Sequence, residues 1–69
     1  MENLRELLER MLFIETCINE GDINTAKEYN EHFHVFDNAE IQLNNVDNKD
    51  YKSYWRIKLL YNKLITNFK

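Results

Sequence analysis

Apolar side chains recur every three or four residues in three stretches of this chain, which is the spacing of one face of an α-helix. In the first stretch, Asn3 followed by Glu6 has the form of a capping box, and Gly21 suits the left-handed backbone with which many helices end. We therefore predict a helix over about residues 3–20. Its apolar stripe consists of Leu4, Leu7, Leu8, Met11, Leu12, Ile14 and Ile18.

The second stretch begins directly after Gly21, where Asp22 is suited to cap a new helix. The turn between the two stretches is so short that we expect an antiparallel helical pair. Asp37 and Glu40 leave two interpretations open, because they fit either a helix interior or a fresh cap after a break. We predict one helix over about residues 22–44 and place any kink near residue 37. Its stripe consists of Ala26, Tyr29, Phe33, Phe36 and Leu43.

The third stretch follows a polar turn at residues 44–48. Asp47 or Asn48 is the expected N-cap, and Asp50 then falls in the first turn, where the helix dipole favours an acidic side chain. We predict a helix over about residues 48–67. Its expected core stripe consists of Tyr51, Tyr54, Ile57, Tyr61, Leu64, Ile65 and Phe68.

Together these patterns predict an all-α fold in which an antiparallel helical hairpin is joined by a third helix, as in a three-helix bundle. The whole of residues 1–69 is expected to form one domain. A chain of about 60 residues buries only about 60% of its unfolded surface, and a single Cys excludes an internal disulfide. We therefore expect the fold to gain stability by associating with itself or with a larger partner.

The segment from Glu20 to Tyr29 resembles the middle of a tetratricopeptide repeat. In that family a helical hairpin turns on a short loop with Gly and Asp, and a small residue followed by an aromatic begins the second helix, as Ala26 and Tyr29 do here. The chain lacks the Trp, Leu, Gly and Tyr pattern and the closing Pro of the repeat, and no second copy follows. The resemblance implies a helical hairpin, and we assign the chain to no family.

Charge is unevenly distributed along the chain. The net charge is −3 overall, with −3 in residues 1–20, −4 in residues 21–45 and +4 in residues 46–69. An acidic total disfavours a general nucleic-acid or membrane binder, since both depend on a positive field. No signal peptide or transmembrane run is visible, so we expect a cytoplasmic protein. The abundance of Asn, Ile, Lys and Tyr suggests a phage, a plasmid or a low-GC bacterium as the source.

Residues with reactive or metal-ligating side chains are few. Cys17 lies at the edge of an apolar stripe in an acidic segment, which favours a small buried filler over a nucleophile. His32 and His34 point about 200° apart on a helix, and Glu28 with His32 supplies only two of the three ligands that a metal site needs. We therefore expect no enzyme activity, no metal, no cofactor and no small-molecule substrate.

The most informative pattern is a second face on the third helix, opposite the expected core. It combines a tryptophan, two leucines and three cations, and Trp and Arg are enriched at the centres of protein interfaces. Phe13 and Val35 also lie opposite their own stripes, which adds surplus apolar surface. If the third helix were central and buried on both flanks, this face would instead belong to the core. The candidate partner-binding residues are Lys52, Trp55, Arg56, Leu59, Leu60 and Lys63.

Two uses of this face are considered. The first is a small interaction module that binds an acidic protein surface or a second copy of itself, as a phage- or plasmid-type regulator or inhibitor of a host protein does. The alternative is a nucleic-acid-binding regulator. In that case Lys49, Lys52, Arg56 and Lys63 contact phosphates while Trp55 stacks on a base. The acidic total and the small number of cations favour the first interpretation.

Overall fold

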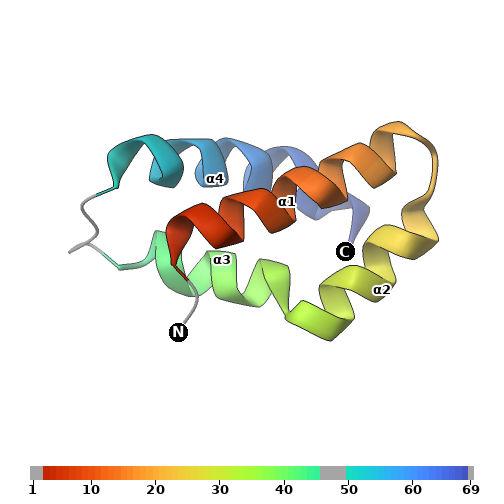
Figure 1. Cartoon of the computed structure of the whole chain (residues 1–69), viewed down its shortest axis with the longest axis horizontal. Helices are drawn as coiled ribbons and strands as arrows, with labels where there is room; N and C mark the ends of the chain where they lie inside the picture. The colour runs from red at the N-terminus through yellow and green to blue at the C-terminus, as the bar shows by residue number, and fades with distance from the viewer. Residues whose placement is uncertain (1–2, 46–49, 69) are drawn as a thin grey trace.

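The computed structural model describes residues 3–45 and 50–68, and within these residues all regular structure is helical. Four α-helices pack into a body of 35 × 19 × 19 Å. Figure 1 shows α2 and α3 running back along α1, and α4 running in the same direction as α1. The all-α prediction is confirmed. The elements are α1 (Leu4–Asn19), α2 (Ile23–Phe33), α3 (Val35–Leu43), α4 (Tyr51–Leu64) and a 3-10 turn, η1 (Ile65–Asn67).

Both ends of α1 follow the predicted local chemistry. The Asn3 side chain accepts a hydrogen bond from the backbone N–H of Glu6 at 2.8 Å, which satisfies one of the unpaired N–H groups of the first turn. Gly21 has a φ of 80°, and the backbone N–H of Asp22 donates to the carbonyl of Cys17 at 2.8 Å. This arrangement is a Schellman motif, in which glycine avoids the steric cost of the left-handed conformation.

The predicted single helix over residues 22–44 is wrong, because the chain breaks at His34 and forms α2 and α3. Asp22 caps α2 as expected, accepting from the N–H of Thr25 at 3.1 Å and from its hydroxyl at 2.7 Å. His34 then adopts a left-handed conformation with φ 52° and ψ 45°. The break therefore lies three residues before Asp37, where the sequence suggested a kink.

Two asparagine side chains satisfy backbone groups that the break leaves without helical partners. The Asn30 amide oxygen accepts from the backbone N–H of Phe36 at 3.0 Å, and the Asn38 amide donates to the carbonyl of Phe33 at 3.2 Å. The left-handed conformation costs a non-glycine residue roughly 1–2 kcal/mol, which these bonds help to offset. The break also turns Val35 inward. Val35 is fully buried, so its predicted outward position is wrong.

The start of α4 differs by a few residues from the prediction. Asp47 and Asn48, the expected caps, lie outside the described residues. Asp50 is the N-cap itself, accepting from the backbone N–H of Ser53 at 3.2 Å. One turn later the Tyr54 hydroxyl donates to the carbonyl of Leu43 at 3.0 Å, which fastens α4 to the end of α3.

The hydrophobic core lies where α1, α3 and α4 meet, with Ala26 contributed by α2. The Phe36 ring packs at a tilt against two aromatic rings from the C-terminal part of the chain, with centroid distances of 4.6 Å to Phe68 and 5.8 Å to Tyr61. Because α1 packs against each of the other helices, it supplies the largest share of the core. The buried apolar residues are Leu4, Leu7, Leu8, Met11, Ile14, Cys17, Ala26, Val35, Phe36, Ala39, Ile57, Leu60 and Leu64.

Candidate interaction surface on α4

Helix α4 has a buried side and an exposed side that are both rich in apolar residues. The buried side consists of Ser53, Ile57, Leu60 and Leu64. On the opposite side, Tyr51, Trp55 and Leu59 are spaced four residues apart, with exposed fractions of 69%, 55% and 68%. Residues four apart lie above one another on a helix, so the three form a continuous apolar strip. We call this strip and the cations beside it, Lys52, Arg56 and Lys63, the outer face of α4.

Five of the six predicted site residues are exposed on α4, and one is not. Lys52, Trp55, Arg56, Leu59 and Lys63 are exposed. Leu60 is only 9% exposed, so its predicted place on the outer face is wrong. The reason is that α4 packs against α1 as well as α3, and the flank that carries Leu60 is covered by α1.

Tyr51 is the residue of the outer face that sequence reasoning missed. We expected it in the core, but it is exposed, while Ser53 is buried on the same side of the helix as Ile57 and Leu60. On a helical wheel Tyr51 lies about 150° from the centre of the arc formed by Ser53, Ile57, Leu60 and Leu64, and only about 40° from Trp55. The repeat of large apolar residues at 51, 55 and 59 is the signal that could have placed it.

The indole ring of Trp55 makes a cation–π contact with Lys58. The ammonium nitrogen of Lys58 lies 5.0 Å from the ring centroid, and the Tyr54 ring meets the indole nearly perpendicularly at 5.7 Å. A cation–π contact at an exposed site contributes about 0.5–1 kcal/mol. The indole is therefore held in place by neighbours of its own helix while about half of its surface stays open.

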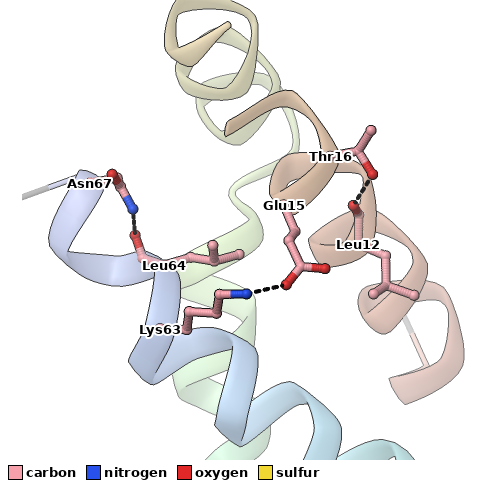
Figure 2. Close-up of polar contacts among 6 residues, drawn as sticks. All are labelled: Leu12, Glu15, Thr16, Lys63, Leu64 and Asn67. Carbon is pink, nitrogen blue, oxygen red and sulfur yellow. Dashed lines mark hydrogen bonds and ion pairs between the residues drawn. The ribbon is translucent and has the colours of Figure 1, made fainter. Parts of the chain in front are cut away.

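A shallow groove of about 290 Å³ runs between the outer face of α4 and α1. Figure 2 shows the Lys63 side chain reaching from α4 towards Glu15 of α1, where its ammonium nitrogen lies 3.0 Å from a carboxylate oxygen. The groove is large enough to receive a side chain of a partner, and its lining is partly apolar and partly charged. Its lining residues are Leu12, Glu15, Arg56, Leu59, Leu60 and Lys63.

Positive charge is concentrated beside the apolar strip. Arg56 lines the groove and is exposed, and its guanidinium makes no ion pair or hydrogen bond with the described residues. Lys52 lies close enough to the cap Asp50 to contribute to the lowering of that carboxyl's pKa. The outer face thus presents an apolar strip with a cationic edge, and a partner that covered it would have to supply negative charge.

A second aromatic cluster lies on the opposite flank of α1, where it meets α2. The rings of Phe13 and Tyr29 are 4.5 Å apart, and the Arg10 guanidinium lies 3.9 Å from the centre of the Phe33 ring. Phe13 is exposed, as predicted. Glu9 lies in the hollow that Arg10 and Tyr29 also line. Here the cation is already used within the molecule, so this cluster lacks the cationic edge of α4.

The residues considered for chemistry do not gather into one site. Cys17 is buried, and burial together with the charges of Asp22 and Glu20 raises the pKa of its thiol, which disfavours a reactive thiolate. The ring nitrogen Nδ1 of His34 lies 3.9 Å from a carboxylate oxygen of Asp37 at an exposed position. Across residues 3–45 and 50–68, no three His, Cys, Asp or Glu side chains are arranged to hold a metal ion.

In the part of the chain that the structure describes, no helix combines the length and the apolar character needed to cross a bilayer.

Comparison with models of protein families, with curated proteins and with solved structures finds no match to this chain. Its function is therefore inferred from the geometry and charge of the surfaces described above.

Proposed function

We propose that the protein is a non-enzymatic interaction module that binds an acidic protein partner through the outer face of α4. The observation that carries this proposal is the exposed strip of Tyr51, Trp55 and Leu59 beside Arg56 and Lys63. Trp, Tyr and Arg dominate the energetics of protein interfaces, and an apolar patch with a polar rim is typical of a contact surface.

The charge of the outer face disfavours a dimer in which two α4 faces pair with each other. If two α4 faces paired with each other, Lys52, Arg56 and Lys63 of one copy would lie close to the same cations of the other. Like charges brought together in this way cost several kcal/mol. An acidic partner places carboxylates against these cations and covers the apolar strip in the same contact.

Such a module acts by covering the surface of its partner. The binding energy comes from the contact surface itself, and the groove beside α4 receives one side chain of the partner. A regulator or inhibitor of the partner protein is the form of activity that this arrangement supports best.

The experiment that tests this proposal compares two double variants. In Trp55→Ala/Arg56→Glu, the outer face loses its largest apolar side chain and reverses one cation. The matched control, Phe13→Ala/Lys27→Glu, makes the same kinds of change on the exposed surfaces of α1 and α2. Tagged wild type and both variants are used to capture proteins from nuclease-treated lysate of the source cell, and each captured protein is then purified and titrated against all three.

We expect the purified partner to be acidic at its contact surface and to bind the wild type and the control equally. Loss of a central interface residue typically costs 2 kcal/mol or more, so Trp55→Ala/Arg56→Glu should weaken binding by about thirtyfold or more. Equal affinity for all three proteins would refute the proposed site. Capture of the chain by itself would indicate self-association, and signal that disappears with nuclease would indicate nucleic-acid binding.

A further inference from the structure

Glu15 occupies a position on α1 where the sequence pattern calls for an apolar residue. On a helical wheel it lies about 20° from Leu8 and about 40° from Met11, both of which are buried. Its side chain is 23% exposed. A carboxylate could be fully solvated on the polar side of α1, so its place beside the core sets Glu15 apart from the other acidic residues of the helix.

This carboxylate neutralises one of the two cations that line the groove. The Lys63 ammonium, on a side chain that is 62% exposed, contacts Glu15 at 3.0 Å. Arg56 lines the same groove, and within the described residues no carboxylate pairs with it. Leu12, Leu59 and Leu60 provide the apolar part of the lining. Figure 2 shows Glu15 and Lys63 pointing towards each other across the space between the two helices.

We propose that this groove receives an aliphatic side chain and an adjacent carboxylate from an acidic helix of the partner, and that Glu15 is the internal competitor of that carboxylate. The inference rests on the proposed function of the outer face of α4 and adds the recognition step. Arg56 binds one partner carboxylate directly. Lys63 exchanges its contact with Glu15 for a contact with the partner.

The exchange is feasible because the internal pair is weak. An ion pair with a largely exposed lysine contributes a factor of about five or less to an equilibrium. Its loss is therefore easily offset by a charge-assisted contact formed as the interface closes over the groove and excludes water. Until then, Glu15 keeps the Lys63 ammonium beside the groove and repels any approaching carboxylate. A carboxylate therefore binds well only when an adjacent aliphatic side chain is buried in the groove with it.

The inference can be tested with synthetic peptides, before the natural partner is known. The probe is an amphipathic helical peptide with leucines along one side and glutamates on both flanks, and its twin carries glutamines in place of the glutamates. Trp55 is the single tryptophan of the chain and belongs to the outer face. Because neither peptide contains an aromatic residue, the emission of Trp55 reports binding directly.

The decisive variant is Glu15→Gln, which removes the competing charge and keeps the shape of the side chain. Its control is Glu28→Gln, which changes the net charge equally on the exposed side of α2, away from the groove. Circular dichroism melts establish that each variant is folded. If Glu15→Gln does not fold, Lys63→Gln tests the same contact from α4. The wild type should bind the glutamate peptide more tightly than the glutamine peptide, and in Lys63→Gln this ratio of affinities should fall by at least half.

We expect the glutamate peptide to bind Glu15→Gln about three- to fivefold more tightly than wild type, while Glu28→Gln binds it as the wild type does. The glutamine peptide should bind all three proteins equally. Two results would overturn this inference and leave the outer face as a binding site: no gain for Glu15→Gln, or equal gains for both variants. If the glutamate peptide changes the Trp55 emission of none of the proteins, both the inference and the proposed acidic partner are refuted.

Discussion

Helices α1 and α4 lie side by side and run in the same direction, yet they place their apolar residues in different ways. Glu15 of α1 contacts Lys63 of α4, and the Arg5 charge reaches the cap Asp50 at the start of α4. Helix α1 turns most of its apolar residues into the core. Helix α4 buries Ser53 and three aliphatic residues, and it exposes the larger Tyr51 and Trp55 together with Leu59.

The difference indicates which helix stabilises the fold and which one is available for binding. Apolar area removed from water contributes about 25 cal/mol per Å² to folding. Because most of the apolar area of α1 is buried in the folded chain, it already stabilises the fold. The exposed apolar area of α4 contributes only when a partner covers it. On α1 the carboxylate of Glu15 lies within the apolar stripe, and on α4 the apolar strip faces solvent. Glu15 and Leu59 of that strip line the same groove.

The largest effect expected from this comparison is a contrast between two identical substitutions. Leu7 of α1 is fully buried, whereas Leu59 of α4 is 68% exposed. We expect Leu7→Ala to lower the free energy of unfolding by about 2–5 kcal/mol, because it leaves a cavity in the core. Leu59→Ala should change it by no more than about 0.5 kcal/mol. Urea denaturation followed by circular dichroism measures both, and similar costs would contradict the division of roles.

Leu60→Ala sharpens the same contrast within α4. Leu60 and Leu59 are neighbours in the sequence, but only Leu60 is buried. We expect its truncation to cost about 2 kcal/mol or more. In any variant that still folds, it should weaken partner binding less than Leu59→Ala does, because only a small exposed part of Leu60 lines the groove. A small cost in stability with a large cost in binding would restore Leu60 to the outer face, as the sequence pattern predicted.

The parts of the fold that the sequence predicts correctly depend on interactions between residues close together in the chain. Asn3 with Glu6, Gly21 and Asp22 act within one turn of their own positions, so the two ends of α1 and the start of α2 are as expected. The break at His34 has no such marker, because the chain contains no Pro and Gly21 is its only glycine. A weaker signal was present. The apolar stripe of α3 is rotated by about 100° from that of α2 when both are drawn on one continuous helix.

The candidate site was predictable as a face of α4 but not in its exact limits. Spacing alone shows that Trp55, Arg56 and Leu59 share one side of a helix. Whether a flank of that helix is buried depends on which neighbours pack against it, and those contacts join residues far apart in the chain. The sequence pattern therefore predicts Leu60 on the surface and Tyr51 in the core, whereas in the structure Leu60 is buried and Tyr51 is exposed. Glu15 gave no sign of its role, since its partner Lys63 is 48 residues away.

We expect a change of intermediate size in the free energy of unfolding when Glu15, the carboxylate within the apolar stripe of α1, is replaced. Glu15→Leu extends the buried apolar stripe of α1 into the groove, and the exposed Lys63 can be solvated once its partner is lost. Removing one partner of an ion pair is costly only when the other charge stays buried. Lys63 is largely exposed, so we expect the added apolar contact to give a gain of about 1 kcal/mol. For a chain of this size that corresponds to a melting temperature about 4–8 °C higher.

Calorimetry of Glu15→Leu and of the surface control Glu28→Leu measures this gain. A loss of stability in the first variant would show that Glu15 is there to hold the two helices together. A gain would show that the chain keeps a carboxylate at a cost to its own stability. That is expected of a residue that serves binding.

The smallest expected effect is a difference in how acid changes the stability of α1 and α4, because the two helices have different N-cap residues. Asn3 caps α1 with a neutral amide, whereas Asp50 caps α4 with a carboxylate. Hydrogen bonds from the backbone and the hydroxyl of Ser53, together with the charges of Arg5 and Lys52, lower the pKa of Asp50 below its ordinary value of 3.8. The folded state therefore binds this proton less readily than the unfolded state does. The stabilisation is present above pH 3.8 and is lost as the pH falls through the lowered pKa.

Asp50→Asn should separate this effect from the general consequences of acid, because asparagine caps a helix without titrating. Between pH 7 and pH 3 we expect the melting temperature of the wild type to fall more than that of Asp50→Asn, so that the difference between them narrows. The converse variant, Asn3→Asp, gives α1 a titrating cap and should make its melting temperature fall more steeply over the same range. Parallel curves for all three proteins would mean that protonation of the cap does not weaken the start of either helix. The acid sensitivity of the fold would then have to arise elsewhere, first at Asp22, whose pKa is lowered by hydrogen bonds from Thr25.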